Sequence, residues 1–104
     1  GGVTPEPTPT PTLEGTWMLN DTLVAPESSF SESISFTVGG AQATGVHNET
    51  NDLYVTFATG TTSAIYSFSQ NTWYYPNMKT WVFPSGATAS DNFITWLAAN
   101  ATKQ

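Results

Sequence analysis

Aromatic side chains gathered in the second half of the chain are the residues best suited to bind a ligand. With two neighbouring amides, they are Trp73, Tyr74, Tyr75, Trp81, Asn71 and Asn77. Sugar rings stack on flat, exposed aromatic rings, and amide side chains can bond sugar hydroxyls. Successive strand side chains point to opposite faces, so at least one of three consecutive aromatics should be exposed or at an edge. The cluster predicts either a glycan-binding platform or core residues with an exposed aromatic patch, which could also contact another protein.

A second group of candidate residues lies in one polar segment. His47, Glu49 and Asp52 are close enough in sequence to suggest a metal site. The alternative is a solvated turn, in which one histidine and two carboxylates are common, and the sequence offers no second cluster of metal-ligating residues. We therefore expect no bound metal.

The acidic residues are a third group of candidates, in this case for catalysis. General acid–base catalysis needs two carboxylates positioned in one cleft. Glu27, Glu32, Asp52 and Asp91 fall in predicted turns or at the ends of predicted elements. The sequence also contains no nucleophile elbow, P-loop or dinucleotide fingerprint. We therefore predict that the chain is not an enzyme and holds no cofactor.

The charge balance argues against polyanionic partners. The 104 residues include eight acidic side chains and only two basic ones, Lys79 and Lys103, for a net charge of −6. Nucleic acids and anionic membrane surfaces bind clustered Lys and Arg, so neither is an expected partner. No apolar run approaches the ~20 residues of a membrane span, and no insertion is expected. The absence of Cys excludes disulfides and thiolate metal sites.

Residues 1–12 predict an extended linker. From Thr4 to Thr12 the chain alternates almost strictly between Pro and Thr. Proline restrains its own backbone and disfavours helix in the preceding residue, so this run should form a semi-rigid spacer of ~3 Å per residue. We expect residues 13–104 to be one module of a longer extracellular or virion protein. Gly1 and Gly2 could be a tag remnant.

The elements that would position the candidate residues are mostly strands. In residues 33–38, Ile34, Phe36 and Val38 alternate with Ser and Thr, as in an antiparallel strand with one wet face. Further strands are expected at 13–20, 42–46, 53–57, 64–68 and 79–83, with a polar turn at 47–52.

The C-terminal segment changes to a helical period. The apolar residues at this spacing are Phe93, Ile94, Leu97 and Ala101. Thr88 or Ser90 can cap a helix over residues 90–101. Short helices are marginal alone, so this one should pack on the sheet. The predicted fold is α+β, with about six mainly antiparallel strands and one short C-terminal helix; the alternative is a small all-β barrel or sandwich.

Several short motifs are spread over residues 13–104. They are Gly15-Thr16-Trp17, Ile34-Ser35-Phe36, Ala64-Ile65-Tyr66, Asn71-Thr72-Trp73, Tyr75 to Phe83, and the tail from Phe93 to Gln104. In this order they resemble a small repeated module of minor structural, tail-associated proteins of phages and prophages of gut Firmicutes. The tail, with its Trp-Leu-x-x-Asn-Ala-Thr-x-Gln ending, is the most specific of these motifs. The Gly-Thr-Trp start is also similar to that of lipocalin-like barrels, although ~90 residues is short for a barrel with a ligand cavity.

Two functions follow as expectations. The resemblance implies a non-catalytic accessory or surface-binding module of a phage tail or related extracellular multi-domain protein, located on a virion or cell surface. The alternative is a carbohydrate-binding module appended to a secreted bacterial enzyme, with the aromatic cluster as its binding surface. The expected partners are other domains of the parent chain and a cell-surface glycan or protein.

Overall fold

A computed structural model describes residues 12–104; residues 1–11, which hold nearly all of the predicted linker, lie outside the described residues. The described elements are β1 (Gly15–Leu19), β2 (Ser31–Val38), β3 (Ala41–Glu49), β4 (Asp52–Phe57), β5 (Thr62–Ser67), β6 (Thr72–Trp73), a 3₁₀ turn η1 (Pro76–Met78), β7 (Thr80–Phe83), α1 (Asp91–Asn100) and β8 (Ala101–Lys103). The fold is α+β, with an antiparallel sheet and one C-terminal α-helix, which confirms the predicted class.

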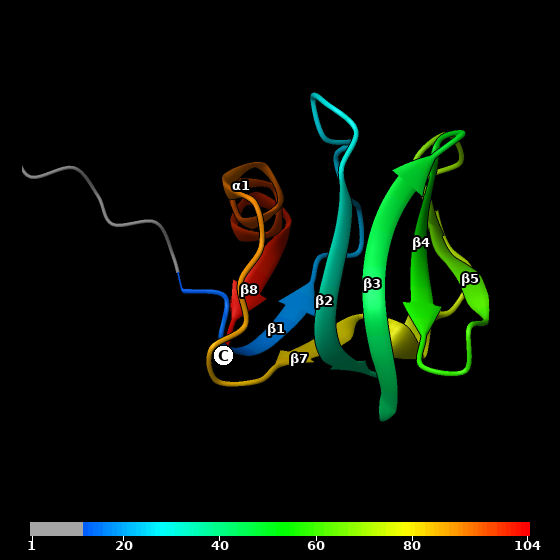
Figure 1. Ribbon diagram of the computed structural model, residues 1–104. Coiled ribbons are helices and arrows are strands. Elements are labelled where there is room, and N and C mark those ends of the chain that lie inside the picture. Colours follow the sequence, from blue (N-terminus) through cyan, green and yellow to red (C-terminus); the bar gives the residue numbers. More distant parts are fainter. Residues whose placement is uncertain (1–11) are drawn as a thin grey trace, which may run out of the picture.

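All the strands join one antiparallel sheet in the order β6-β5-β4-β3-β2-β7-β1-β8. Strands β2 to β5 form a meander of neighbouring hairpins, whereas β1 and β7 pair across a long stretch of sequence. Figure 1 shows β1 and β7 steeply inclined to β2, β3 and β4, so the sheet is strongly twisted and coiled. The sequence predicts about six strands; the two-residue β6 and the three-residue β8 bring the described number to eight.

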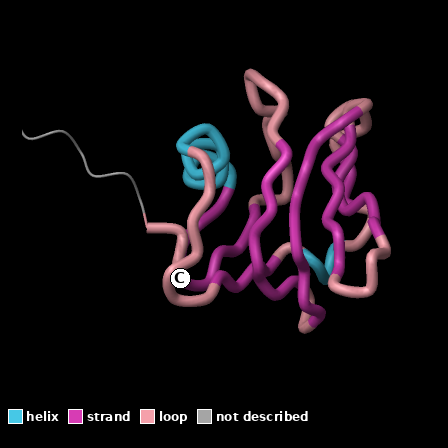
Figure 2. Tube along the Cα trace, viewed as in Figure 1, coloured by secondary structure: helices cyan, strands magenta, loops and turns pink. Residues whose placement is uncertain are grey.

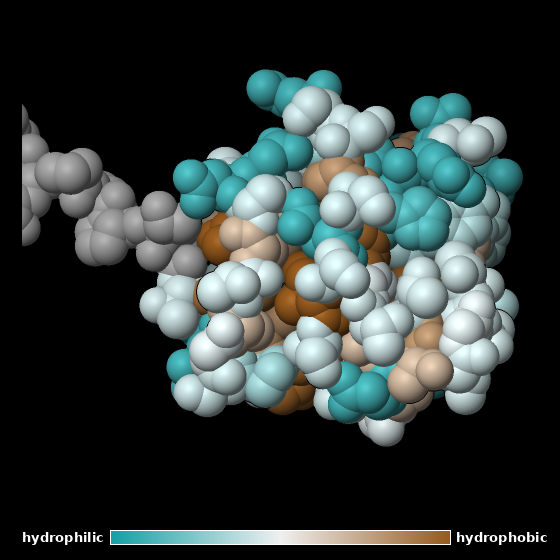
Figure 3. Space-filling model, in the orientation of Figure 1, coloured by the Kyte–Doolittle hydropathy of each residue, from teal (hydrophilic) through white to brown (hydrophobic). Residues whose placement is uncertain are grey.

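The inner face of the sheet carries the core. In β2, Ile34, Phe36 and Val38 are buried, whereas Ser33 and Ser35, which alternate with them, are exposed, as predicted. Phe36 stacks on Phe83 of β7 with ring centroids 4.9 Å apart. The face of the molecule seen in Figure 3 is mostly polar or neutral in hydropathy, with brown apolar residues visible between the others.

Helix α1 packs its apolar stripe against this core. Phe93, Ile94 and Leu97 are all buried, which confirms the predicted helix face. Ser90 is the N-cap: its hydroxyl accepts a hydrogen bond from the backbone N–H of Phe93 at 3.2 Å. The same Ser90 hydroxyl and its backbone N–H donate to the carboxylate of Glu32, so the helix start is tied to β2.

The helix ends one residue earlier than predicted. Ala101 is extended, and the chain passes directly into β8, which the sequence does not predict. The buried side chain of Asn100 explains the stop. Its Oδ1 accepts from the N–H of Val24 at 2.7 Å, while its Nδ2 donates to the carbonyl of Trp96 at 2.9 Å. The end of the helix is thereby fastened to the connection between β1 and β2, which Figure 2 shows as a loop standing beside the helix.

The predicted polar turn over residues 47–52 is wrong in its extent. Strand β3 continues to Glu49 and β4 begins at Asp52, so the turn is only Thr50 and Asn51. Their φ angles of 51° and 64° are those of a two-residue hairpin turn that matches the strand twist. The polar residues before the turn can lie in a strand because their side chains alternate between two suitable environments. His47 and Glu49 are on the outer face, whereas Asn48 is opposite the buried Leu53 and its Oδ1 accepts a hydrogen bond from the N–H of Phe30 at 2.9 Å.

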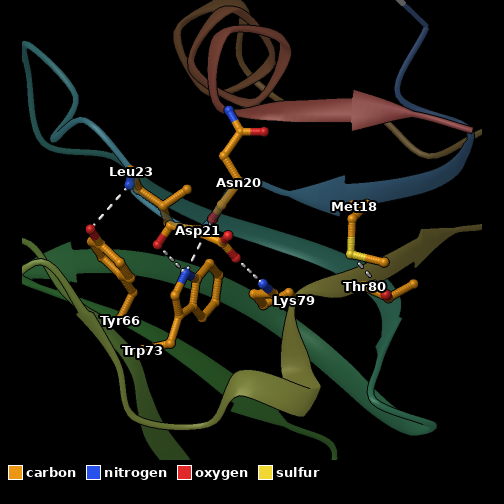
Figure 4. Close-up of polar contacts among 8 residues, drawn as sticks. All are labelled: Met18, Asn20, Asp21, Leu23, Tyr66, Trp73, Lys79 and Thr80. Carbon is orange, nitrogen blue, oxygen red and sulfur yellow. Dashed lines mark hydrogen bonds and ion pairs between the residues drawn. The ribbon is translucent and has the colours of Figure 1, made fainter.

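The connection after β1 also reaches the far end of the sheet. Tyr66 of β5 is fully buried, and its hydroxyl accepts from the N–H of Leu23 at 3.0 Å and donates to Asn71 Oδ1 at 3.3 Å. Lys79 forms an ion pair with Asp21 in the same region (Figure 4). The loop after β1 therefore connects one end of the curled sheet to the other through its contacts with Tyr66 and Lys79.

We expect Tyr66→Phe to lower the free energy of unfolding by ~1–3 kcal/mol, because it leaves the buried N–H of Leu23 without its acceptor. Chemical denaturation followed by circular dichroism measures the change. Tyr75→Phe is the matched control, since the Tyr75 side chain is exposed. Equal stability of the two variants would show that the Tyr66 hydroxyl does not hold the loop.

Candidate functional site

Trp81, one of the predicted binding residues, is a core residue. Its side chain is 0% exposed and packs against Phe36 with ring centroids 5.4 Å apart. Its indole N–H donates to the carbonyl of Met78 at 3.0 Å. Trp81 therefore has no face left for a ligand, and we remove it from the candidate surface. The alternation in β7 turns Trp81 and Phe83 inward and Val82 outward.

Trp73 makes structural contacts at the edge of the sheet. Its ring is half-buried and meets Tyr66 edge-on, with centroids 5.1 Å apart. Its indole N–H donates to the carbonyl oxygens of Asn20 and Asp21, at 3.1 and 2.8 Å, as Figure 4 shows. Trp73 thus joins the loop after β1 to β6, and its polar atom is already used.

The other predicted residues lie on the surface. Tyr74 and Tyr75 are 42% and 43% exposed, and Asn71 and Asn77 are exposed as well. Tyr74 follows Trp73 at the bend after β6, with its N–H donating to the carbonyl of Ile65 at 3.0 Å. Its side chain is exposed and lies close enough to Tyr54 to contribute to the raised pKa of that phenol, so Tyr74 lies on the outer side of the sheet. Asn71 occupies a left-handed turn position, with φ 49°.

The outer face of the sheet carries a row of residues that local sequence patterns do not predict. Ser31, His47, Tyr54 and Ala64 lie directly opposite one another on strands β2, β3, β4 and β5. We call these four residues, with Tyr74 beyond them, the outer row. His47 and Tyr54 are stacked, with ring centroids 5.3 Å apart and planes 12° from parallel.

The outward orientation of Tyr54 is predictable from the sequence, because Tyr54 alternates with the apolar residues Leu53 and Val55, which are buried. His47 falls in the predicted turn and is a candidate only for a metal site, so the local sequence does not pair it with Tyr54. Only the pairing register of β3 with β4 places the two rings together.

A polar hollow of about 230 Å³ adjoins the outer row at His47. Its hydroxyl-bearing lining residues are Ser31, Ser33, Thr44 and Thr56. Gly45 forms part of its floor, at a bulge where the register of β2 against β3 shifts. Neighbouring hydroxyls of this type can both donate to and accept from a ligand hydroxyl.

Gly45 is required by close backbone approach. A Cβ atom at this position would lie 2.7 Å from the carbonyl oxygen of Glu32, and backbone cannot swing away as a side chain can. We therefore expect Gly45→Ala to destabilise the protein by ~1–3 kcal/mol, as other overpacking substitutions do. Thermal unfolding measures this; Gly60→Ala is a useful comparison, because its Cβ meets nothing within 4 Å although its φ of 84° adds backbone strain. A smaller cost at Gly45 than at Gly60 would contradict the steric explanation.

The outer row lies in an acidic environment. Partial burial, followed by the nearby carboxylates of Asp52 and Glu49, raises the pKa of the Tyr54 phenol. His47 Nε2 lies 4.0 Å from Glu49 Oε1. The chain has only two Lys and no Arg, and neither lysine lines the polar hollow.

Both lysines are engaged elsewhere. Lys79 pairs with Asp21 and lowers the pKa of that carboxyl group, first through their hydrogen bond. Lys103 donates to the carbonyl of Thr12 at 2.9 Å and lies over the ring of Trp17. Because both cations are held by other groups, the outer row presents polar hydroxyls, aromatic rings and acidic charge.

The acidic residues and the histidine do not converge on one point. Across residues 12–104, no three His, Cys, Asp or Glu side chains are grouped closely enough to hold a metal ion. Glu32 is bonded to Ser90, and Asp91 lies in the first turn of α1. No helix among the described residues has the length and apolar character needed to cross a membrane.

Comparison of the chain with protein families, with curated proteins and with solved structures finds no match.

Proposed function

We propose that residues 13–104 are a non-catalytic accessory module that binds a surface on behalf of a phage tail or related extracellular multi-domain protein. The observation that carries the proposal is the outer face of the sheet, where the exposed Tyr74 lies near Tyr54, which is itself stacked on His47. Aromatic side chains left at the surface are typical of binding sites. The Pro-Thr run of residues 4–12 suits a spacer that holds such a surface away from an anchoring domain.

A second candidate function is a carbohydrate-binding module of a secreted bacterial enzyme. The exposure of Tyr74 and Tyr75 beside Asn77 favours it, because these side chains can stack on sugar rings and bond their hydroxyls. The two candidates differ in the parent chain. Tail or holin genes beside the gene would support the first, whereas a glycosidase domain in the same chain would support the second and overturn the first.

The test of surface binding uses the full chain carrying a fluorescent label. It is added to intact gut Firmicutes cells and to their purified cell walls, and bound protein is measured after sedimentation. We expect saturable binding that unlabelled protein displaces. Absence of saturable binding to both preparations would overturn the surface-binding proposal.

A further inference from the structure

We infer that the outer row and the polar hollow together bind an uncharged polysaccharide chain, with a sugar ring seated between Tyr54 and Tyr74. This inference rests on the surface-binding function proposed above and assigns its site and its ligand class. Three features of the outer face carry it: a preorganised aromatic ring, a lining of hydroxyls, and no lysine or arginine from residues 12–104 at the outer row.

The first feature is the space between two tyrosines. Tyr54 is stacked against His47 on one side, and this contact restrains its ring. On the other side its neighbour across the ladder is Ala64, whose methyl group is too small to cover an aromatic ring. Tyr74 lies beyond Ala64, since its N–H bonds to the carbonyl of Ile65. Two strand spacings separate the tyrosines, ~10 Å between backbones, so a sugar ring fits above Ala64 and meets both side chains.

The second feature is the hydroxyl lining on the other side of His47. The row continues from His47 to Ser31, and both residues border the polar hollow of about 230 Å³. A sugar chain that leaves the tyrosines along the row therefore passes over Ser31, Ser33 and Thr44. Serine and threonine hydroxyls rotate to donate or accept, so they match the hydroxyls of a saccharide without demanding a charge.

The third feature is charge, which selects among polysaccharides. Glu49 and Asp52 lie beside Tyr54, close enough to raise its pKa, and the whole chain carries a net charge of −6. Lys79 and Lys103 are paired away from the outer row. A polyanion such as a uronate or a polyol phosphate would meet repulsion with no compensating cation. An uncharged chain meets none, and its affinity should not depend on salt, because no charge pair is screened.

The test is affinity electrophoresis and titration calorimetry of the full chain with three polysaccharide classes. The probes are neutral glucans, mannans and galactans, the polyanion polygalacturonate, and the polycation chitosan, each at low and at high salt. We expect binding to at least one neutral polymer, with an affinity that changes less than about twofold between the two salt conditions, and no binding to polygalacturonate.

Variants of the outer row locate the site. Tyr54→Ala and Tyr74→Ala should each weaken binding about tenfold, equivalent to ~1.4 kcal/mol. Tyr54→Phe keeps the ring and should retain binding. Met18→Ala is the matched control, because Met18 is 41% exposed on the outer face of β1 and lies outside the outer row. Circular dichroism confirms that each variant is folded.

The outcomes separate this inference from the proposed function. Binding to cells but to no neutral polysaccharide overturns the inference and leaves surface binding intact. Unchanged affinity in both alanine variants, or binding only to chitosan that disappears at high salt, also overturns it. Failure to bind cells, cell walls and every polysaccharide overturns both.

Discussion

A Trp81→Ala variant is expected to lose ~3–5 kcal/mol of unfolding free energy, the usual cost of removing a fully buried large aromatic side chain. Trp81 lies where the sheet is assembled from distant segments: it is opposite Trp17 of β1 and Val38 of β2. The substitution removes the contact with Phe36 and leaves the carbonyl of Met78 without the indole donor. Since small domains are stable by only ~5–15 kcal/mol, this loss is a large share of the total, and the variant should unfold at a clearly lower temperature and denaturant concentration.

Urea denaturation followed by far-ultraviolet circular dichroism measures this loss without relying on tryptophan fluorescence. Val82→Ala is the matched control, because Val82 is the next residue on β7 and its side chain points outward. We expect that control to change the stability by no more than ~0.5 kcal/mol. If Trp81→Ala were as mild as Val82→Ala, Trp81 could not be a core residue, and its place in the binding surface would have to be reconsidered.

Leu97→Ala should cost ~2–4 kcal/mol, as for other leucines truncated in a core. Leu97 is fully buried on the inner side of α1, between the helix and the sheet. A ten-residue helix is marginal by itself, so its contacts with the core decide whether it forms. The variant should therefore lose helical content together with stability rather than keep an intact helix beside a small cavity.

The control on the same helix is Thr95→Ala, because Thr95 is exposed. Alanine has the higher helix propensity, so this substitution should be neutral or slightly stabilising. Equal stability of Leu97→Ala and the unmodified chain, by denaturation or calorimetry, would mean that the helix does not cover the sheet.

The parts of the fold that were predictable are those governed by local periodicity. The two-residue alternation of Ile34, Phe36 and Val38 predicts a strand with one buried face, and the spacing of Phe93, Ile94 and Leu97 predicts a helix on the core. Both are confirmed. Strand β8 was not predicted, because its three residues carry no pattern of their own and pair with β1 only once the helix has brought them there.

The candidate site was less predictable, because exposure depends on neighbours. Trp73, Tyr74 and Trp81 are all aromatic residues in or next to predicted strands. In the structure, Trp73 joins a loop to the edge of the sheet, Tyr74 is exposed and Trp81 is fully buried. His47 and Tyr54 are seven positions apart in the chain, and only a two-residue turn places them opposite each other. A shift of one residue in that register would have sent one of the rings to the opposite face.

The sequence by itself determined the class of fold and which faces of the clear strands and of the helix are buried, because these follow from side-chain periods of two and 3.6 residues. It also determined the acidic charge that disfavours polyanions, because charge follows from composition. Only the tertiary structure decided which aromatic residues remain exposed. Burial and cross-strand neighbours are set by pairing between distant segments, which local sequence does not encode. That pairing placed Trp81 in the core and assembled the outer row from four strands and the segment after β6.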